Sequence, residues 1–538
     1  MSLTIFSVVD EFNLSFTFVV YCLQFMRKSV ILIPLCFILL TANLFAQNVN
    51  RTKFIADSLD AYINRALTNW RIPGAAVCIV KDNKIVLMKG YGVKELGLNN
   101  KVDENTLFMI GSNTKAFTAT ALAMLEDQKQ LSLDDKVTKY IPTFKLDNQL
   151  AGEDARIRDL LCHRLGFGTF QGDFTYWTSD LTREQVVEKM SHVKALYPFR
   201  TKWGYTNAAF VAAGQIITKV TDRSWDSYIK DYLFAPLGMG YTKALTKDMP
   251  TVYNKAAAHT IADGRLVPIT YCQLDNLAPA GSISSSVNDM SKWVLCLLND
   301  GKVGPRQVIP LSAIKAVRQP QDYVGQHRHP DGTTSDILYG LGFELENYAG
   351  HRVVMHTGGV NGFVSSVTMI PDEHLGIIVL TNTDQNELYD ALKWEIIDAI
   401  NNKPYQNYSD KYLAAYKNQV QADQQQDKKL RDSVALKPAP GLPLSAYTGR
   451  YTNDLYGTMT IDMGGENNTE LQMHFEHHPK MYALLQPLGQ NRFYATFSDP
   501  EFGKAVFPFR IQNGQVTGVR VKVADFIEYT PYEFKKVP

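Results

Sequence analysis

Gly111-Ser112-Asn113-Thr114-Lys115 is the most informative stretch of this sequence. The apolar residues that follow it, as far as Glu126, recur at helical spacing, so Ser112 and Lys115 stand one turn apart at the start of a helix. A serine hydroxyl is unreactive at neutral pH unless a neighbouring group takes its proton, and the lysine amine is placed to do so. The spacing alone is weak evidence, because it recurs at Ser191/Lys194, Ser227/Lys230 and Ser312/Lys315.

Two further motifs follow in a fixed order. Tyr205-Thr206-Asn207 lies 93 residues after Ser112, and His356-Thr357-Gly358-Gly359 begins 151 residues after Tyr205. The Tyr-x-Asn pattern recurs elsewhere, whereas the His-Thr-Gly element occurs once. The order and the separations therefore carry more weight than any single motif.

Strand-like segments stand at both ends of the region that holds these motifs. Residues 75–80 and 85–88 predict two strands joined by a turn at Asp82-Asn83. A mostly helical region, 131–300, separates them from a second group of strands and a closing amphipathic helix, predicted at 353–355, 363–370, 375–380 and 388–400. This pattern predicts an α+β domain in which one sheet, built from both ends, encloses a helical insertion.

The composition changes after this domain. Residues 404–440 are polar, charged and then rich in proline, which is typical of a linker, and helical structure is compatible with part of it. Short alternating runs follow at 459–461, 471–475, 493–497, 505–511 and 516–523. They predict a small all-β barrel or sandwich over 441–538.

The N-terminus has the pattern of an export signal. Met26-Arg27-Lys28 precedes the apolar residues 30–40, and Ala46 is a small residue before a plausible cleavage point. The apolar run is shorter than the ~20 residues of a bilayer span. We therefore expect residues 1–46 to be a leader, with Met26 as the true start and 26–46 as the signal peptide. The mature protein would be periplasmic or secreted, without a stable membrane span; an N-terminal membrane anchor is the alternative.

The charge and composition of the chain limit the classes of binding partner that we expect. The 538 residues suggest about three domains, and a net charge of +1 gives no reason to expect nucleic acid or an anionic membrane surface. We expect a small-molecule or peptide substrate. The cysteines outside the leader are predicted to be buried free thiols: Cys78, Cys162, Cys272 and Cys296. No Cys/His cluster has zinc spacing, and His327 and His329 fall in an expected polar loop, so we expect neither metal nor cofactor.

The three motifs together resemble the serine beta-lactamase-related family, which includes class C beta-lactamases, D,D-carboxypeptidases, D-aminopeptidases and esterases. The resemblance extends from about residue 52 to 400 and includes Ile72-Pro-Gly-Ala-Ala, Leu160-Leu-Cys-His163 and Phe234-Ala-Pro-Leu-Gly-Met239. It implies a beta-lactamase/transpeptidase-like antiparallel sheet flanked by helices over 47–403. The residues after 441 resemble the small β domain often appended to these hydrolases, and homo-oligomerisation through that domain is one role open to it.

The resemblance implies a role for each motif residue. Ser112 would attack a carbonyl group and become the acyl-enzyme, and Asn207 would hydrogen-bond Lys115 or a substrate amide. The backbone N–H groups of Ser112 and Gly359 are the candidates for an oxyanion hole. Lys115 could take the first proton if burial lowers its pKa, and Tyr205 could do so if a cation stabilises its phenolate, so the choice between them stays open.

His356 is where the chain departs from the efficient beta-lactamases that it resembles, which usually carry lysine there. A histidine is only partly charged at neutral pH. We therefore expect His356, Thr357 and Gly358 to contact a peptide substrate containing D-amino acids, or an ester. The alternatives are a beta-lactam substrate, a catalytically silent binding protein that retains the fold, and a chain whose main function lies in the C-terminal domain. His356 and Tyr205 could also be purely structural.

Overall fold

The structure is a computed structural model that describes residues 54–329, 332–464 and 470–537. The predicted leader, 1–46, lies outside the described residues. The chain divides into two compact units, of which the larger comprises residues 63–395 and 406–538. Every feature of the site and of the C-terminal barrel discussed below lies within this larger unit.

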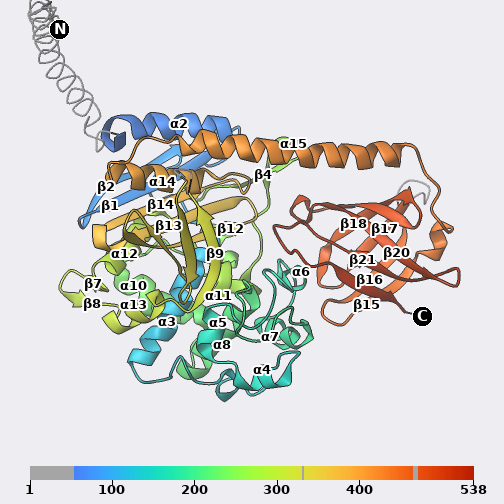
Figure 1. Cartoon of the computed structure of the whole chain (residues 1–538), viewed down its shortest axis with the longest axis horizontal. Coiled ribbons are helices and arrows are strands. Elements are labelled where there is room, and N and C mark those ends of the chain that lie inside the picture. Colours follow the sequence, from blue (N-terminus) through green and yellow to red (C-terminus); the bar gives the residue numbers. More distant parts are fainter. Residues whose placement is uncertain (1–53, 330–331, 465–469, 538) are drawn as a thin grey trace, which may run out of the picture. The chain divides into compact units, whose positions relative to one another are not determined.

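An eight-stranded antiparallel sheet forms the centre of the catalytic region, in the order β2-β1-β14-β13-β12-β11-β10-β9. Figure 1 shows the first strands (blue) beside strands from the far end of the region (yellow to orange). The strands are β1 (Gly74–Lys81), β2 (Lys84–Gly92), β9 (Asp322–Arg328), β10 (Thr334–Tyr339), β11 (Glu344–Tyr348), β12 (His351–Val360), β13 (Phe363–Ile370) and β14 (Leu375–Thr381). The predicted closure of one sheet from both ends is confirmed.

The strands form where the sequence is continuously apolar or β-branched. All residues of β13 and β14 are buried, and β14 pairs with β1 along its whole length. Asp82 and Asn83 both have positive φ values, of 51° and 62°, as a two-residue hairpin turn between β1 and β2 requires. The sequence did not predict β9, β10 and β11, whose exposed residues are mostly polar.

Most of the helices come from the part of the chain between β2 and β9. The central helix, α3 (Thr114–Asp127), is buried from Thr114 to Leu125, because its alanines and threonines are small enough for close packing on several sides. The other helices are α2 (Leu59–Trp70), α4 (Gln149–Asp154), α5 (Ile157–Leu161), α6 (Asp173–Tyr176), α7 (Arg183–Lys189), α8 (Asn207–Thr221), α9 (Trp225–Ile229), α10 (Ala235–Leu237), α11 (Ala278–Gly281), α12 (Val287–Leu298), α13 (Leu311–Arg318) and α14 (Leu388–Ile400). Three small sheets accompany them: β3 (Phe108–Met109) with β6 (Ser284–Ser285), β4 (Ala258–Ala262) with β5 (Arg265–Ile269), and β7 (Lys302–Val303) with β8 (Arg306–Gln307).

The C-terminal domain is a closed eight-stranded barrel, which confirms the predicted all-β class. Its strands are β15 (Gly449–Asn453), β16 (Gly457–Gly464), β17 (Glu470–Phe475), β18 (His478–Gly489), β19 (Arg492–Phe497), β20 (Lys504–Gln512), β21 (Gln515–Val521) and β22 (Tyr532–Lys536). The barrel closes where β15 pairs with β22. Before it, much of the segment interpreted as a linker forms a 28-residue helix, α15 (Tyr408–Ala435), whose side chains are mostly exposed.

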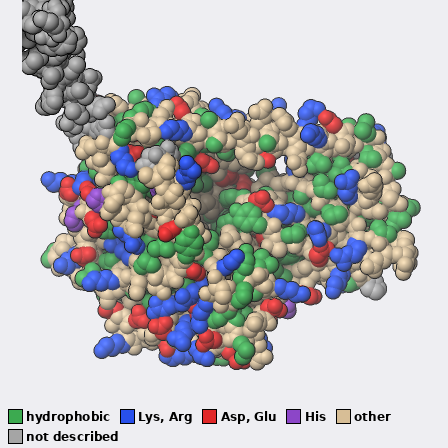
Figure 2. Space-filling view, in the orientation of Figure 1, with side chains coloured by type: hydrophobic (Ala, Val, Ile, Leu, Met, Phe, Trp, Pro, Cys, Tyr) green, Lys and Arg blue, Asp and Glu red, His purple; other side chains and the backbone are tan. Residues whose placement is uncertain are grey.

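The surface charges and the state of the cysteines agree with what the composition predicts. On the face drawn in Figure 2, basic and acidic side chains are interspersed. Within the described residues, no helix is both long and apolar enough to cross a membrane. The four cysteines outside the predicted leader are all buried and free, as predicted.

Candidate active site

Ser112 lies in a short 3₁₀ turn, Gly111–Asn113, directly before α3. The residue at the N-cap of α3 is Asn113, so Ser112 is not the capping residue of that helix. Its hydroxyl oxygen instead accepts a hydrogen bond from Lys115 Nζ at 3.0 Å. A second hydrogen bond joins it to the Tyr205 side chain. Both candidate bases therefore contact the same hydroxyl group.

Lys115 is a buried lysine held by three oxygen atoms. Besides Ser112, its amine donates to Asn207 Oδ1 at 2.7 Å and to the Ala280 carbonyl at 2.9 Å. Burial lowers the pKa of Lys115 from 10.5 to about 7, against the opposing charge of Asp173. An amine with that pKa is substantially uncharged at neutral pH and can accept a proton.

Asn207 connects Lys115 to a buried carboxyl group. It begins α8, and its Nδ2 donates to Asp173 Oδ2 at 2.6 Å while its Oδ1 accepts from Lys115. Burial raises the pKa of Asp173 well above its usual range, with a further contribution from Glu528. The Asn207 amide therefore orients the Lys115 amine and links it to the Asp173 carboxyl group. Of the two contacts considered for Asn207 from the sequence, the structure forms the one to Lys115.

Tyr205 lies against Lys115 but differs from it electrostatically. The amine is 4.6 Å from the centroid of the phenol ring, which packs on the ring of His163 at 4.3 Å. Burial raises the pKa of Tyr205 well above 10, and the hydrogen bond with Ser112 opposes this only in part. The phenol is therefore protonated at neutral pH.

A directional chain of hydrogen bonds continues from this side of the site. The Thr206 N–H donates to His163 Nδ1 at 3.0 Å, so the His163 proton is on Nε2, 3.3 Å from the Tyr339 oxygen. His356 Nδ1 donates to the Thr357 carbonyl at 2.6 Å, which leaves Nε2 to accept from the Tyr339 hydroxyl at 2.9 Å. These partners fix the tautomer of both neutral imidazoles.

His356 differs from the partly charged histidine expected from the sequence. The side chain is buried, and both ring nitrogens bond to the protein. Burial lowers its pKa to about 3, with a contribution from the charge of Lys115. The imidazole is therefore neutral at pH 7 and offers no cation to a substrate carboxylate.

The glycines of the third motif allow two backbones to approach each other. A β-carbon at Gly358 would lie 1.9 Å from the Ile110 carbonyl, and one at Gly111, where φ is 52°, would lie 3.0 Å from Gly359 N. The turn that holds Ser112 therefore abuts the Gly358-Gly359 end of β12, as an oxyanion hole formed by the N–H groups of Ser112 and Gly359 requires. Thr357 precedes these glycines on β12 and is partly exposed.

Three of the residues in this arrangement were not assigned from the sequence. His163 lies in the stretch Leu160-Leu-Cys-His163, which contributes to the resemblance but received no assigned role. Asp173 and Tyr339 had no motif at all. The signal that identifies them is spatial: each is buried and bonds directly to a motif residue or to the neighbour of one.

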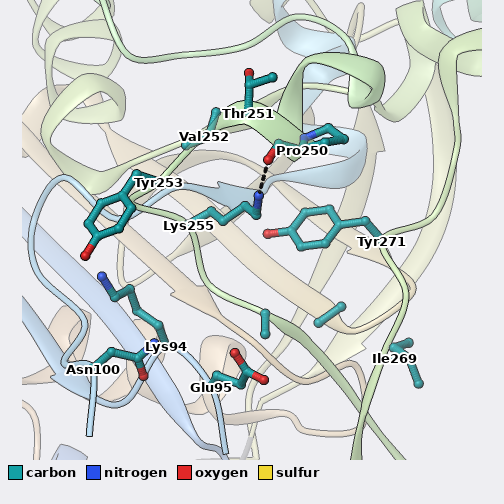
Figure 3. A pocket seen from close by; sticks show the side chains of 12 residues that line it. Lys94, Glu95, Asn100, Pro250, Thr251, Val252, Tyr253, Lys255, Ile269 and Tyr271 are labelled. Carbon is teal, nitrogen blue, oxygen red and sulfur yellow. Dashed lines mark hydrogen bonds between the residues drawn. The ribbon is translucent and has the colours of Figure 1, made fainter. Parts of the chain in front are cut away.

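A side-chain cluster and a cavity elsewhere in the structure could also bind an ion or a ligand. Among the described residues, His327, His329 and Glu346 could hold a metal ion: His327 Nδ1 and His329 Nε2 lie 2.9 and 2.8 Å from Glu346 Oε1. His327 belongs to β9 rather than to a loop, which corrects the sequence-based interpretation. Both imidazole contacts are to the same carboxylate oxygen, which also accepts a hydrogen bond from the Ser335 hydroxyl. A cavity of about 560 Å³ (Figure 3), in which Lys255 donates to the Pro250 carbonyl, includes no residue of the site around Ser112.

Comparison with known proteins identifies the family. Residues 59–402 match the family described as Beta-lactamase, and residues 435–536 match a domain of unknown function, DUF3471. The chain is 28% identical over 432 residues to Unguisins hydrolase ungD of Aspergillus violaceofuscus, covering 74% of this chain and 75% of that protein. It is 26% identical over 372 residues to Protein flp of Staphylococcus aureus, covering 67% and 70%.

Two solved structures share the fold. The octameric penicillin-binding protein homologue from Pyrococcus abyssi has a TM-score of 0.57 at 20% identity, covering 89% of this chain and all (100%) of that chain. SurE has a TM-score of 0.54 at 17% identity, covering 90% and 100%. These likenesses confirm the predicted beta-lactamase/transpeptidase-like fold. Since the family match spans most of the sequence, the chain belongs to the beta-lactamase family and is a serine hydrolase.

Proposed function

We propose that this protein is an exported hydrolase that cleaves a peptide containing D-amino acids, or an ester, through a covalent acyl-Ser112 intermediate. The observation that carries the proposal is the 3.0 Å hydrogen bond between Ser112 Oγ and the buried Lys115 amine, whose pKa of about 7 suits a general base. A phenol whose pKa is well above 10 does not suit that role. We therefore assign the first proton transfer to Lys115.

In the proposed reaction, neutral Lys115 takes the Ser112 proton as Oγ attacks the carbonyl carbon. The N–H groups of Ser112 and Gly359 would stabilise the resulting oxyanion, at about 3 kcal/mol each. Collapse of the tetrahedral intermediate breaks the bond to the leaving amine or alcohol, which receives a proton from Lys115. Water then attacks the acyl-enzyme, again with Lys115 as base; the bond between the acyl carbon and Ser112 Oγ breaks, Lys115 returns the proton to Oγ, and the acid is released.

The neutral state of His356 supports a peptide or an ester over a beta-lactam. A beta-lactam carries a carboxylate, and at the position of His356 it would meet an uncharged imidazole whose nitrogens are already engaged. Beta-lactam hydrolysis is therefore an outcome of the test rather than a second proposal.

Mass spectrometry after incubation with a fluorophosphonate tests the nucleophile. We expect one adduct on Ser112 that is absent in Ser112→Ala, with Ser312→Ala, which shares the serine–lysine spacing, as the labelled control. A chromogenic cephalosporin, a D-Ala-D-Ala peptide, a D-Leu anilide and a short ester would then identify the substrate. The D-Leu compound is included because SurE has been solved with D-Leu. Fastest turnover of the cephalosporin by orders of magnitude would overturn the preference.

Export and assembly are further proposals. Cleavage after Ala46 should give a mature N-terminus at Gln47, which N-terminal sequencing of protein from the periplasm or medium would identify. A chain retained in the cytoplasm with its leader intact would contradict export. We also propose homo-oligomerisation through the barrel, since the Pyrococcus abyssi homologue is described as octameric. Light scattering on the full chain should then give a mass above that of a monomer.

A further inference from the structure

One loop of the barrel contacts the segment beside the active site. Residues 522–531, which connect β21 to β22, contain the buried Glu528. Its carboxylate accepts the N–H of Gly172 and the N–H of Phe174, both at 2.9 Å, and the Tyr532 hydroxyl at 2.9 Å. Gly172 and Phe174 are the neighbours of Asp173, the partner of Asn207. This carboxylate therefore fixes the barrel loop to the segment that supports Lys115.

A catalytic-domain side chain reinforces this attachment from the opposite direction. Phe174, in α6, is fully buried among aromatic rings of the barrel. Its ring centroid lies 4.8 Å from that of Tyr456, 5.2 Å from that of Tyr532 and 5.7 Å from that of His478. Burial of such a ring is favourable, because it removes apolar surface from water. The loop is therefore held at the site by packing as well as by hydrogen bonds.

Two exposed aromatic side chains flank Glu528 in the loop. Phe526 is 40% exposed, and its Cε2 lies 3.4 Å from where a β-carbon of Gly359 would be. Tyr529 is 53% exposed and stacks on Phe170, with centroids 5.7 Å apart. Phe170 in turn meets the Tyr205 ring edge-on at 5.5 Å. One ring therefore borders the oxyanion side of Ser112, and the other borders the Tyr205 side.

We propose that Phe526 and Tyr529 of the barrel form an apolar subsite that binds a hydrophobic or aromatic group of the substrate next to the bond that Ser112 attacks. Exposed aromatic rings held rigidly by a buried anchor are suited to contact with apolar ligands. The preferred substrates would carry a large apolar group beside the scissile bond. This inference rests on the proposed function and names its substrate class.

Ester turnover by the full chain tests the subsite. The acyl group is varied with p-nitrophenyl acetate and p-nitrophenyl phenylacetate, and the alcohol with ethyl acetate and benzyl acetate. We expect Phe526→Ala and Tyr529→Ala each to reduce the preference for the larger member of one pair about tenfold, mainly through KM. Tyr482→Ala removes a partly exposed barrel ring (37% exposed) on β18 and should leave the preference unchanged.

Labelling of Ser112 by a small fluorophosphonate separates the possible failures. Variants that label at the wild-type rate are folded and active, so an unchanged preference in both ester pairs would overturn the subsite. Wild-type protein that neither labels nor turns over any ester would instead overturn the proposed function. If a single variant does not fold, Phe526→Leu and Tyr529→Leu keep apolar volume and should show a smaller loss in the same direction.

Discussion

Buried polar groups are stabilised in different ways on the two sides of Ser112. On the lysine side, formed by Lys115, Asn207 and Asp173, a buried amine and a buried carboxyl group share one amide. On the aromatic side, formed by Tyr205, His163, Tyr339 and His356, phenols and imidazoles are hydrogen-bonded in their neutral forms. The side chains of both sides are buried, but only the lysine side holds a group that titrates near neutrality.

This difference separates proton transfer from positioning. Burial moves the pKa of Lys115 toward 7, while the same burial moves the pKa of Tyr205 and that of His356 away from 7 in opposite directions. The lysine side can therefore exchange a proton during turnover. The aromatic side keeps one protonation state and holds the end of β12 and the Tyr205 ring in place.

Removal of the base should have the largest effect. Lys115→Met keeps an unbranched apolar chain in the buried site but has no amine, so we expect the rate of Ser112 acylation to fall by about 10⁴-fold, the upper range for a general base. Tyr205→Phe should cost about 10²-fold. Stopped-flow measurement with a fluorophosphonate compares the two variants. Lys315→Met, an exposed lysine with the same spacing from a serine, should label normally. A larger loss in Tyr205→Phe than in Lys115→Met would instead assign the role of general base to Tyr205.

The pH dependence of the wild-type enzyme should follow Lys115. The amine must be uncharged to accept a proton, and it is protonated below a pKa of about 7. We therefore expect kcat/KM for an uncharged ester to fall as the pH is lowered through about 7, by about tenfold per pH unit below it. A profile flat from pH 5 to 8 would mean that the titrating base is not Lys115.

Asp173→Asn should shift that profile without abolishing activity. The charge of Asp173 raises the pKa of Lys115, so its removal should lower the apparent pKa of the acid limb, by about one unit. Asparagine can still accept the hydrogen bond from Asn207. Asp180→Asn, at a partly exposed carboxylate, is the control. An unchanged profile would show that Asp173 is uncharged in the working enzyme and would remove it from the lysine side.

The motif residues that the structure brings together could be proposed from the sequence because each motif is local. The pair Ser112/Lys115 is one helical turn, and His356 to Gly359 is one strand end, so short-range spacing determines each of them. Asp173, His163 and Tyr339 act through contacts between distant segments and have no such spacing. The charge state of His356 depends on burial, and a residue type alone does not report burial.

The strands also divide into those that local sequence predicts and those that depend on tertiary contacts. The sequence predicted β13 and β14, which are continuously apolar, and the Asp82-Asn83 turn, whose residues tolerate positive φ. It did not predict β18, which contains two prolines, or β9, most of whose exposed residues are polar. These strands form because neighbouring strands supply hydrogen bonds, which is a tertiary effect.

Tyr339→Phe should have the smallest effect on catalysis. It removes the hydroxyl that accepts from His163 Nε2 and donates to His356 Nε2, and leaves two buried nitrogens without that partner. Each unsatisfied group costs about 1–3 kcal/mol, so the thermal midpoint should fall, while acylation slows less than tenfold because no proton transfer passes through this side. Tyr482→Phe, on the barrel, is the control. If Tyr339→Phe moved the acid limb as Asp173→Asn is expected to do, the aromatic side would be coupled to the titration of Lys115, and the division of labour between the two sides would fail.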